Sequence, residues 1–107
     1  MDIGDIEKAK KLLKEADNIA VLTGAGISAE SGVPTYRGSG GIWSKFAASE
    51  LASPEAFREN PRKVWEWYGS RRKEMLKAEP NPGHLALAQL ELVTPRFRLI
   101  TQNIDNL

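Results

Sequence analysis

The chain has 107 residues, enough for one domain and too few for two of ordinary size. Its 15 basic and 14 acidic side chains leave a net charge of +1, so it has no strong positive field for direct, non-specific binding of nucleic acid. It has no run of 18 apolar residues and no cysteine, which excludes a spanning helix, a disulfide and a thiolate zinc site within these residues. The N-terminus lacks the pattern of a secretory signal, so we expect a cytoplasmic protein with no membrane contact.

The first predicted element is an amphipathic helix over residues 2–16. Its apolar side chains recur at near-helical spacing, and four lysines fall largely on the opposite face. We interpret the lysines as a solvated face, with a partner-binding site as the alternative. An aliphatic run over residues 19–23 then predicts a buried strand.

The strand leads into a glycine turn with the spacing of a dinucleotide-binding site. Gly24, Gly26 and Ala29 follow the pattern G-x-G-x-x-G/A. Gly24 permits a tight turn, and Gly26 lets the backbone come close to a pyrophosphate. A short helix beginning at Ser28 would present free N–H groups to an anion. The same spacing is also typical of simple strand–helix packing, so the turn alone leaves a purely structural role open.

A glycine-rich loop follows where an ordinary Rossmann unit has a full helix. Gly32 and Pro34 end the short helix, and residues 38–41 read Gly-Ser-Gly-Gly. Tyr36 and Arg37 stand between them, so the loop carries an aromatic ring and a guanidinium. We expect such a loop to close over a ligand.

The rest of the chain is mostly helical. Ser53-Pro54 and Asn60-Pro61 each combine a capping side chain with a proline at the first helical position, which predicts two helix starts. The second start launches the longest helix, and Pro80-Asn81-Pro82 breaks it. The other predicted elements, in chain order, are helices over residues 43–51, 61–77 and 83–92 and a strand over residues 97–101.

These elements predict an α/β fold built on a partial, Rossmann-like parallel sheet. A right-handed crossover would place the two strands side by side. The helices of residues 43–78 are too many for one crossover, so we expect a helical module belonging to a smaller lobe. The glycine turn and the polar segment Gln102-Asn103-Ile104-Asp105 both follow strand carboxyl ends, where ligands bind in parallel sheets.

Two segments of the chain resemble the signatures of the sirtuin family. Residues 24–38 read GAGISAESGVPTYRG, similar to the family's GAGIS-x-x-SGIP-x-FRG, and residues 101–105 read TQNID, a second signature of the family. The resemblance extends over residues 19–107. It implies an NAD-dependent protein-lysine deacylase, of deacetylase or desuccinylase type, that transfers the acyl group to ADP-ribose and releases nicotinamide.

The resemblance implies roles for residues of both signatures. Asn103 would orient the nicotinamide ribose or a water beside it, and is the candidate catalytic residue. Asp105 would hold the nicotinamide carboxamide. Tyr36 stands where the family has phenylalanine and would shield the nicotinamide–ribose bond, whereas Thr35 replaces an aspartate found in many members. The candidate cofactor-binding residues are Gly24, Ala25, Gly26, Ser28, Glu30, Tyr36, Arg37, Trp43, Gln102, Asn103, Ile104 and Asp105.

Structural roles remain open for several of these residues. Ser28 can cap the short helix, and Tyr36 can pack in a core. Arg37 can anchor the loop by a salt bridge, and a strand-end Asn-x-Asp can simply form a turn.

Tyr68 and Arg71 are the candidate substrate-binding residues. They lie three positions apart on the predicted long helix, so they share a face. A phenol and a guanidinium can receive a carboxylate. The pair resembles the Tyr-x-x-Arg motif of class III sirtuins, which implies an acyl-lysine protein or peptide with an acidic chain such as succinyl. An aromatic core stripe is the alternative, and we interpret the single histidine, His84, as structural.

The resemblance also implies parts that these residues do not contain. Sirtuins have a catalytic histidine directly after the QNID-x-L segment and a four-cysteine zinc module. We therefore interpret residues 1–107 as the N-terminal part of a sirtuin catalytic domain, with zinc expected only in the missing C-terminal part. Alone, this piece would be inactive and could self-associate through exposed sheet edges. The alternatives are a non-catalytic NAD- or ADP-ribose-binding module and a helical interaction fragment that binds no nucleotide.

Overall fold

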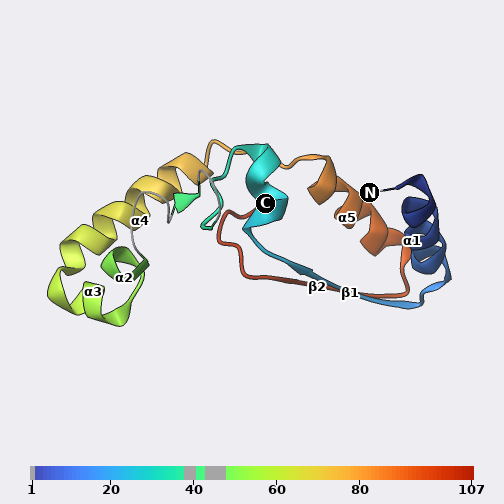
Figure 1. Ribbon diagram of the computed structural model, residues 1–107, viewed down its shortest axis with the longest axis horizontal. Helices are drawn as coiled ribbons and strands as arrows, with labels where there is room; N and C mark the ends of the chain where they lie inside the picture. The colour runs from blue at the N-terminus through green and yellow to red at the C-terminus, as the bar shows by residue number, and fades with distance from the viewer. Residues whose placement is uncertain (1, 38–40, 43–47) are drawn as a thin grey trace.

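The computed structural model describes residues 2–37, 41–42 and 48–107. The elongated body, with extents of 52 × 28 × 25 Å, combines helices with a parallel two-stranded sheet (Figure 1), which confirms the predicted α/β class. Of the helix predicted over residues 43–51, the described part is a single short turn, and residues 43–47 lie outside the described ranges. In chain order the elements are α1 (Ile3–Glu15), β1 (Asn18–Thr23), the 3₁₀ helix η1 (Ala25–Ser31), α2 (Ala48–Leu51), α3 (Pro54–Glu59), α4 (Pro61–Met75), α5 (Pro82–Val93) and β2 (Arg96–Thr101).

Capping side chains fix where the central helices begin. Ser53 Oγ accepts a hydrogen bond from the Ala56 N–H at 3.1 Å, and Asn60 Oδ1 accepts one from the Lys63 N–H at 3.1 Å. A proline follows each cap. Proline is tolerated there because an N–H at the first helical position has no acceptor within the helix. Both predicted starts are therefore confirmed, and α4 ends at Met75, two residues before the predicted end.

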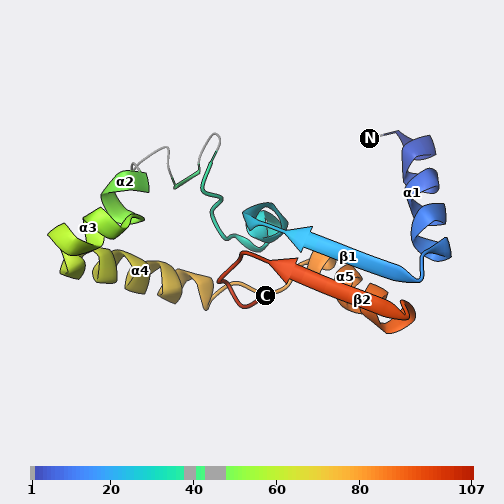
Figure 2. The ribbon, with the colours of Figure 1, turned by 90° about the horizontal axis from the view of Figure 1, so that it is seen from below.

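The two strands pair in parallel and lie side by side, as predicted (Figure 2). The register pairs Asn18 with Arg96 and Thr23 with Thr101, so both strands end at the same edge. Helix α5 lies over one face of this sheet (Figures 1 and 2). The segments that follow Thr23 and Thr101 therefore leave the sheet next to each other.

The buried apolar core lies mainly among the helices α2, α3 and α4, which pack on one another beyond the end of the sheet (Figure 1). By contrast, none of the described side chains of α1 or α5 is buried. The amphipathic face predicted for the first helix is formed, but α1 stands at the end of the sheet (Figure 2), and the described residues leave this face exposed. The buried apolar side chains of the described residues are Ile19, Val33, Ile42, Leu51, Ala56, Val64 and Met75.

Among the described residues, no helix combines the length and the apolar character needed to cross a membrane. The assignment of residues 43–78 to a separate smaller lobe stays a prediction.

Candidate functional site

The two polar motifs meet at the carboxyl ends of the strands. The Asn103 Nδ2 group donates a hydrogen bond to the carbonyl oxygen of Gly24 at 2.9 Å. The backbone N–H of Asn103 donates to Thr101 Oγ1 at 3.1 Å, which fixes the start of the segment after β2. Asn103 thus joins the second signature to the glycine turn of the first, as expected for neighbouring parallel strands.

The glycines of the turn differ in what surrounds them. A Cβ on Gly24 would lie 2.9 Å from Gln102 Nε2, so a side chain there would displace Gln102. Gly32 ends η1 with φ of 87°, a left-handed conformation that favours glycine. A Cβ on Gly26 would meet nothing within 4 Å, so a ligand has room to approach this backbone.

A cavity of about 470 Å³ lies where the loop after η1 faces the segment after β2. This volume lies within the range of small-molecule sites. Arg37 brings a guanidinium to the wall, and among the described residues no carboxylate lies within ion-pairing distance of it. The cavity can therefore receive an anionic group. It is lined by Ala25, Thr35, Tyr36, Arg37, Gln102 and Asn103.

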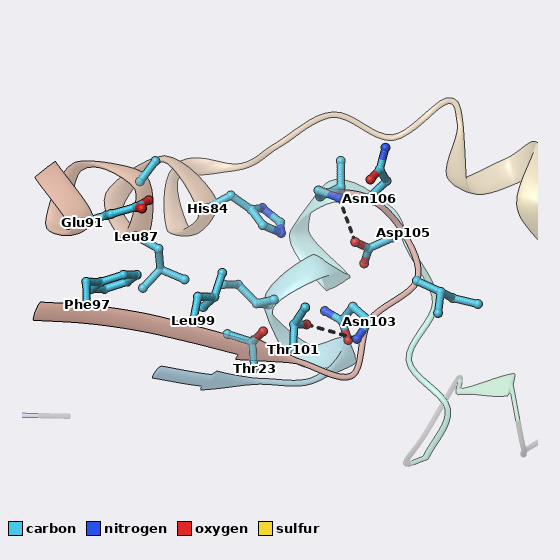
Figure 3. Close-up of a pocket in the computed structure, with 14 residues that line it drawn as sticks. Thr23, His84, Leu87, Glu91, Phe97, Leu99, Thr101, Asn103, Asp105 and Asn106 are labelled. Carbon is cyan, nitrogen blue, oxygen red and sulfur yellow. Dashed lines mark hydrogen bonds between the residues drawn. The ribbon is translucent and has the colours of Figure 1, made fainter. Parts of the chain in front are cut away.

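A neighbouring cavity of about 460 Å³ lies between α5 and β2 (Figure 3). Leu87, Phe97 and Leu99 give it apolar walls, and Asn103 and Asp105 stand at the end near the strand termini. The Asp105 carboxylate accepts a hydrogen bond from the Leu107 N–H at 3.0 Å, so here it shapes the turn after β2. Neither this cavity nor the first one is lined by a glycine of the turn.

The structure therefore brings five predicted cofactor-binding residues into one cavity and distributes the others around it. Ile104 and Asp105 line the neighbouring cavity, Glu30 is exposed, and Trp43 lies outside the described residues. The five in the first cavity are Ala25, Tyr36, Arg37, Gln102 and Asn103.

Ser28 is fully buried, and its partner is a protein side chain. Its Oγ lies 3.3 Å from His84 Nε2, and the other ring nitrogen of His84 accepts a hydrogen bond from the Asn81 N–H at 3.1 Å. Asn81 and His84 form a capping box at the start of α5. This link is not predicted from the sequence, although Asn81-Pro82 has the same cap-and-proline pattern as Asn60-Pro61. A cofactor contact by Ser28 stays a prediction.

The two predicted substrate-binding residues line different cavities. Tyr68 lines a cavity of about 720 Å³ together with Ile104 and Asp105. Arg71 lines a smaller one, of about 170 Å³, beside Gly32. The structure does not bring the two side chains into one cavity, because other residues hold the Arg71 side chain, and a shared receptor stays a prediction.

Two aromatic rings hold the Arg71 guanidinium. Its Cζ lies 5.2 Å from the ring centroid of Tyr36 and 5.2 Å from that of Trp67, at cation–π distance. Arg71 Nη2 also donates to Tyr36 Oη at 3.5 Å. Arg71 Nε is buried and has no hydrogen-bond partner among the described residues. Helix α4 thus contacts the loop that lines the first cavity.

The sequence profile of the Sir2 family matches residues 24–107, which is most of the chain. The chain belongs to the Sir2 family. The predicted resemblance to sirtuins is thereby confirmed, and the Sir2 match includes both signature segments.

Named relatives of this Sir2 chain are similar over nearly all of it. An NAD-dependent protein deacylase of Aquifex aeolicus is 59% identical over 90 residues, which make up 84% of this chain and 38% of that protein. The mitochondrial NAD-dependent protein deacylase sirtuin-5 of Canis lupus familiaris is 54% identical over 102 residues, 92% of this chain and 33% of that protein. The chain thus spans between a third and two fifths of the length of these two curated relatives.

Solved Sir2 structures agree with the fold. A Sir2 homologue in complex with NAD aligns with a TM-score of 0.82 at 48% identity and covers 94% of this chain and 40% of that chain. A mutant Sir2 homologue in complex with ADP-ribose aligns with a TM-score of 0.89 at 45% identity, over 99% of this chain and 41% of that one.

Proposed function

We propose that this chain is the NAD-binding, N-terminal part of an NAD-dependent protein-lysine deacylase. The observation that carries the proposal is the cavity at which the two signature segments meet, with Asn103 bonded to Gly24. The curated relatives are named NAD-dependent protein deacylases, and solved neighbours contain NAD or ADP-ribose. When bound, NAD supplies the ADP-ribosyl group that accepts the acyl chain and the nicotinamide that leaves.

The residues of the cavity fit such a ligand. Arg37 would pair with a phosphate, and the open space above Gly26 would let the backbone approach it. The Nδ2 group of Asn103 is bonded to Gly24, so its Oδ1 is the atom that can accept from a ribose hydroxyl or a water. The Tyr36 ring would cover the reacting end of the ligand and exclude water.

The substrate we propose is an acyl-lysine protein or peptide, with preference for an acyl chain that ends in a carboxylate. Arg71 supports this preference because its buried Nε–H lacks an acceptor among the described residues, and a carboxylate would supply one. A Sir2 structure with a deacetylated p53 peptide, 36% identical and with a TM-score of 0.86, shows that a family member binds a peptide.

We place the catalytic histidine and a cysteine-bound zinc in a part of the enzyme beyond these residues. His84, the single histidine, is engaged with Asn81 and Ser28, and the chain has no cysteine. In the described ranges, no group of histidine, aspartate and glutamate side chains could hold a metal. The sheet also presents apolar surface for further elements to cover, since Leu22 is 76% exposed and Ile100 is 56% exposed.

The proposal is tested by measuring nicotinamide release from the full-length protein. We expect release to require both NAD and an acyl-lysine peptide, with one nicotinamide formed for each lysine freed. Binding of NAD in a calorimeter without any release would support the non-catalytic binding module instead. Absence of binding to NAD and to ADP-ribose would overturn both.

A further inference from the structure

One side chain at the start of α5, that of Asn81, holds the 3₁₀ helix η1. Its Nδ2 donates a hydrogen bond to the carbonyl oxygen of Ile27 at 2.7 Å and to Ser31 Oγ at 3.0 Å. Helix η1 has only seven residues, and 3₁₀ helices have poor internal hydrogen-bond geometry. Bonds to the rest of the fold therefore decide where η1 lies.

The other end of the same amide caps α5. Asn81 Oδ1 accepts hydrogen bonds from the Gly83 N–H at 2.9 Å and the His84 N–H at 3.4 Å. The amide thus donates to η1 and accepts from α5 at the same time. An asparagine can do both, whereas an ionised aspartate of the same shape can only accept.

The backbone of Asn81 adds a third connection, through His84. The Asn81 N–H donates to His84 Nδ1, so the neutral ring carries its proton on Nε2. That Nε2–H then donates to the buried Ser28 Oγ at 3.3 Å. A second point of η1 is in this way bonded to the start of α5.

Within the described part of the chain, these contacts are the side-chain hydrogen bonds that join residues 27–31 to another element. Helix η1 begins with Ala25, which lines the cavity of 470 Å³, and follows Gly24, which accepts the bond from Asn103. Asn81 itself does not line that cavity. The position of this cavity wall therefore depends on Asn81, which lies outside the cavity.

We propose that Asn81 is a positioning residue for NAD binding, one that holds the glycine turn in place without touching the cofactor. The inference rests on the proposed function. Without the two bonds that Asn81 donates, η1 can shift relative to β2. The two signature segments then no longer contact NAD at the same time. Arg71 on α4 contacts neither Asn81 nor η1 through a hydrogen bond of the described residues, so binding of the acyl-lysine peptide should be unaffected.

The test is the Asn81→Asp variant of the full-length enzyme. Aspartate keeps an oxygen that caps α5, loses both donors and places an oxygen against the Ile27 carbonyl. We expect the KM for NAD to rise about tenfold, the effect of one lost buried hydrogen bond. The kcat and the KM for the peptide at saturating NAD should stay within about twofold of the wild type.

Asn60→Asp is the matched control. Asn60 also caps a helix, through the Lys63 N–H, but among the described residues its side chain bonds to no other element. We expect its KM for NAD to equal that of the wild type. Asn81→Ser serves as a second variant, because serine caps well but is too short to reach Ile27, and it should reproduce the rise.

A wild-type KM for NAD in Asn81→Asp would overturn the inference. An equal rise in the KM for peptide, or the same rise in Asn60→Asp, would also overturn it, because either result indicates a general loss of structure. A wild-type enzyme that releases no nicotinamide would overturn the proposed function itself, so the two failures are distinguishable.

Discussion

The Arg71 guanidinium lies against two aromatic rings, and this arrangement restricts where it can donate hydrogen bonds. The rings of Tyr36 and Trp67 each lie 5.2 Å from the guanidinium carbon. The N–H groups of a guanidinium point outward in its plane, and the Arg71 Nε–H at this edge has no acceptor among the described residues. A planar carboxylate matches that edge better than a neutral acetyl group does.

We expect Arg71→Met to lower kcat/KM for a succinyl-lysine peptide by about 10- to 100-fold, the effect of losing a charge-assisted hydrogen bond. Activity on the acetyl-lysine peptide should change little, because that chain offers no charge. Initial rates on the two peptides check this. Arg62→Met is the control, since Arg62 has 89% of its side chain exposed and pairs with Glu66 in solvent. Equal losses on both peptides would contradict the assignment.

At the scale of elements, two glycines on neighbouring segments have opposite backbone requirements. Gly32 ends η1 in the left-handed region, with φ of 87°. Gly69 lies inside α4, where any residue adopts the helical conformation and alanine is preferred. A Cβ at either position would meet nothing within 4 Å, so the backbone alone decides the outcome of a substitution.

Gly32→Ala should therefore lower the free energy of unfolding by about 1 kcal/mol, because alanine is strained at positive φ. Gly69→Ala should raise it by about 0.5 to 1 kcal/mol through helix propensity. Urea unfolding of the full-length enzyme, followed by circular dichroism, measures both. Shifts in the same direction would contradict this account of η1.

At the scale of the whole molecule, the chain is extended and leaves large apolar side chains exposed to solvent. Its radius of gyration is 17.5 Å, compared with about 13 Å for a compact domain of 100 residues. Leu92 is 86% exposed and Val93 is 77% exposed at the end of α5, and within the described ranges each strand has one edge that pairs with no other strand. Such edges and apolar surface favour association with other chains.

We expect the isolated 107-residue chain to release no nicotinamide and to associate with itself. Sedimentation velocity over a range of concentrations should show species larger than the monomer, while the full-length enzyme at the same concentrations serves as the reference. A single-turnover assay with NAD and a succinyl-lysine peptide checks the activity. Stoichiometric nicotinamide, or a folded monomer at every concentration, would contradict the corresponding half of this prediction.

Local chemistry explains why much of the fold could be predicted from the sequence. The cap-and-proline pairs at Ser53 and Asn60 mark helix starts, because capping depends on residues within one turn. The aliphatic run before Gly24 and the polar run after Thr101 likewise indicate two strand ends. Parallel pairing then predicts that Asn103 lies beside the turn, and the bond to Gly24 agrees with this.

Contacts between distant segments account for what could not be predicted. From the sequence, Asn81 indicates only a helix break. Its bonds to Ile27 and Ser31 cannot be predicted, because they depend on α5 beginning next to η1. The sequence placed Tyr68 and Arg71 on one face of a helix, yet the Arg71 side chain is held by Tyr36, 35 positions earlier. The spacing of two residues in the sequence predicts that they share a helix face, but contacts with other segments decide which rotamer each side chain adopts.

The register of the sheet has a consequence for biosynthesis. Asn18 pairs with Arg96, and every later pair keeps the same offset of 78 residues. Ribosomes add about 5–20 residues per second, so β1 is made roughly 4 to 16 seconds before its partner strand. During that interval a chaperone that binds extended aliphatic segments would find Ile19-Ala20-Val21-Leu22 unpaired. Translation speed across the helical stretch therefore sets the delay before the cavity between the two signature segments can form.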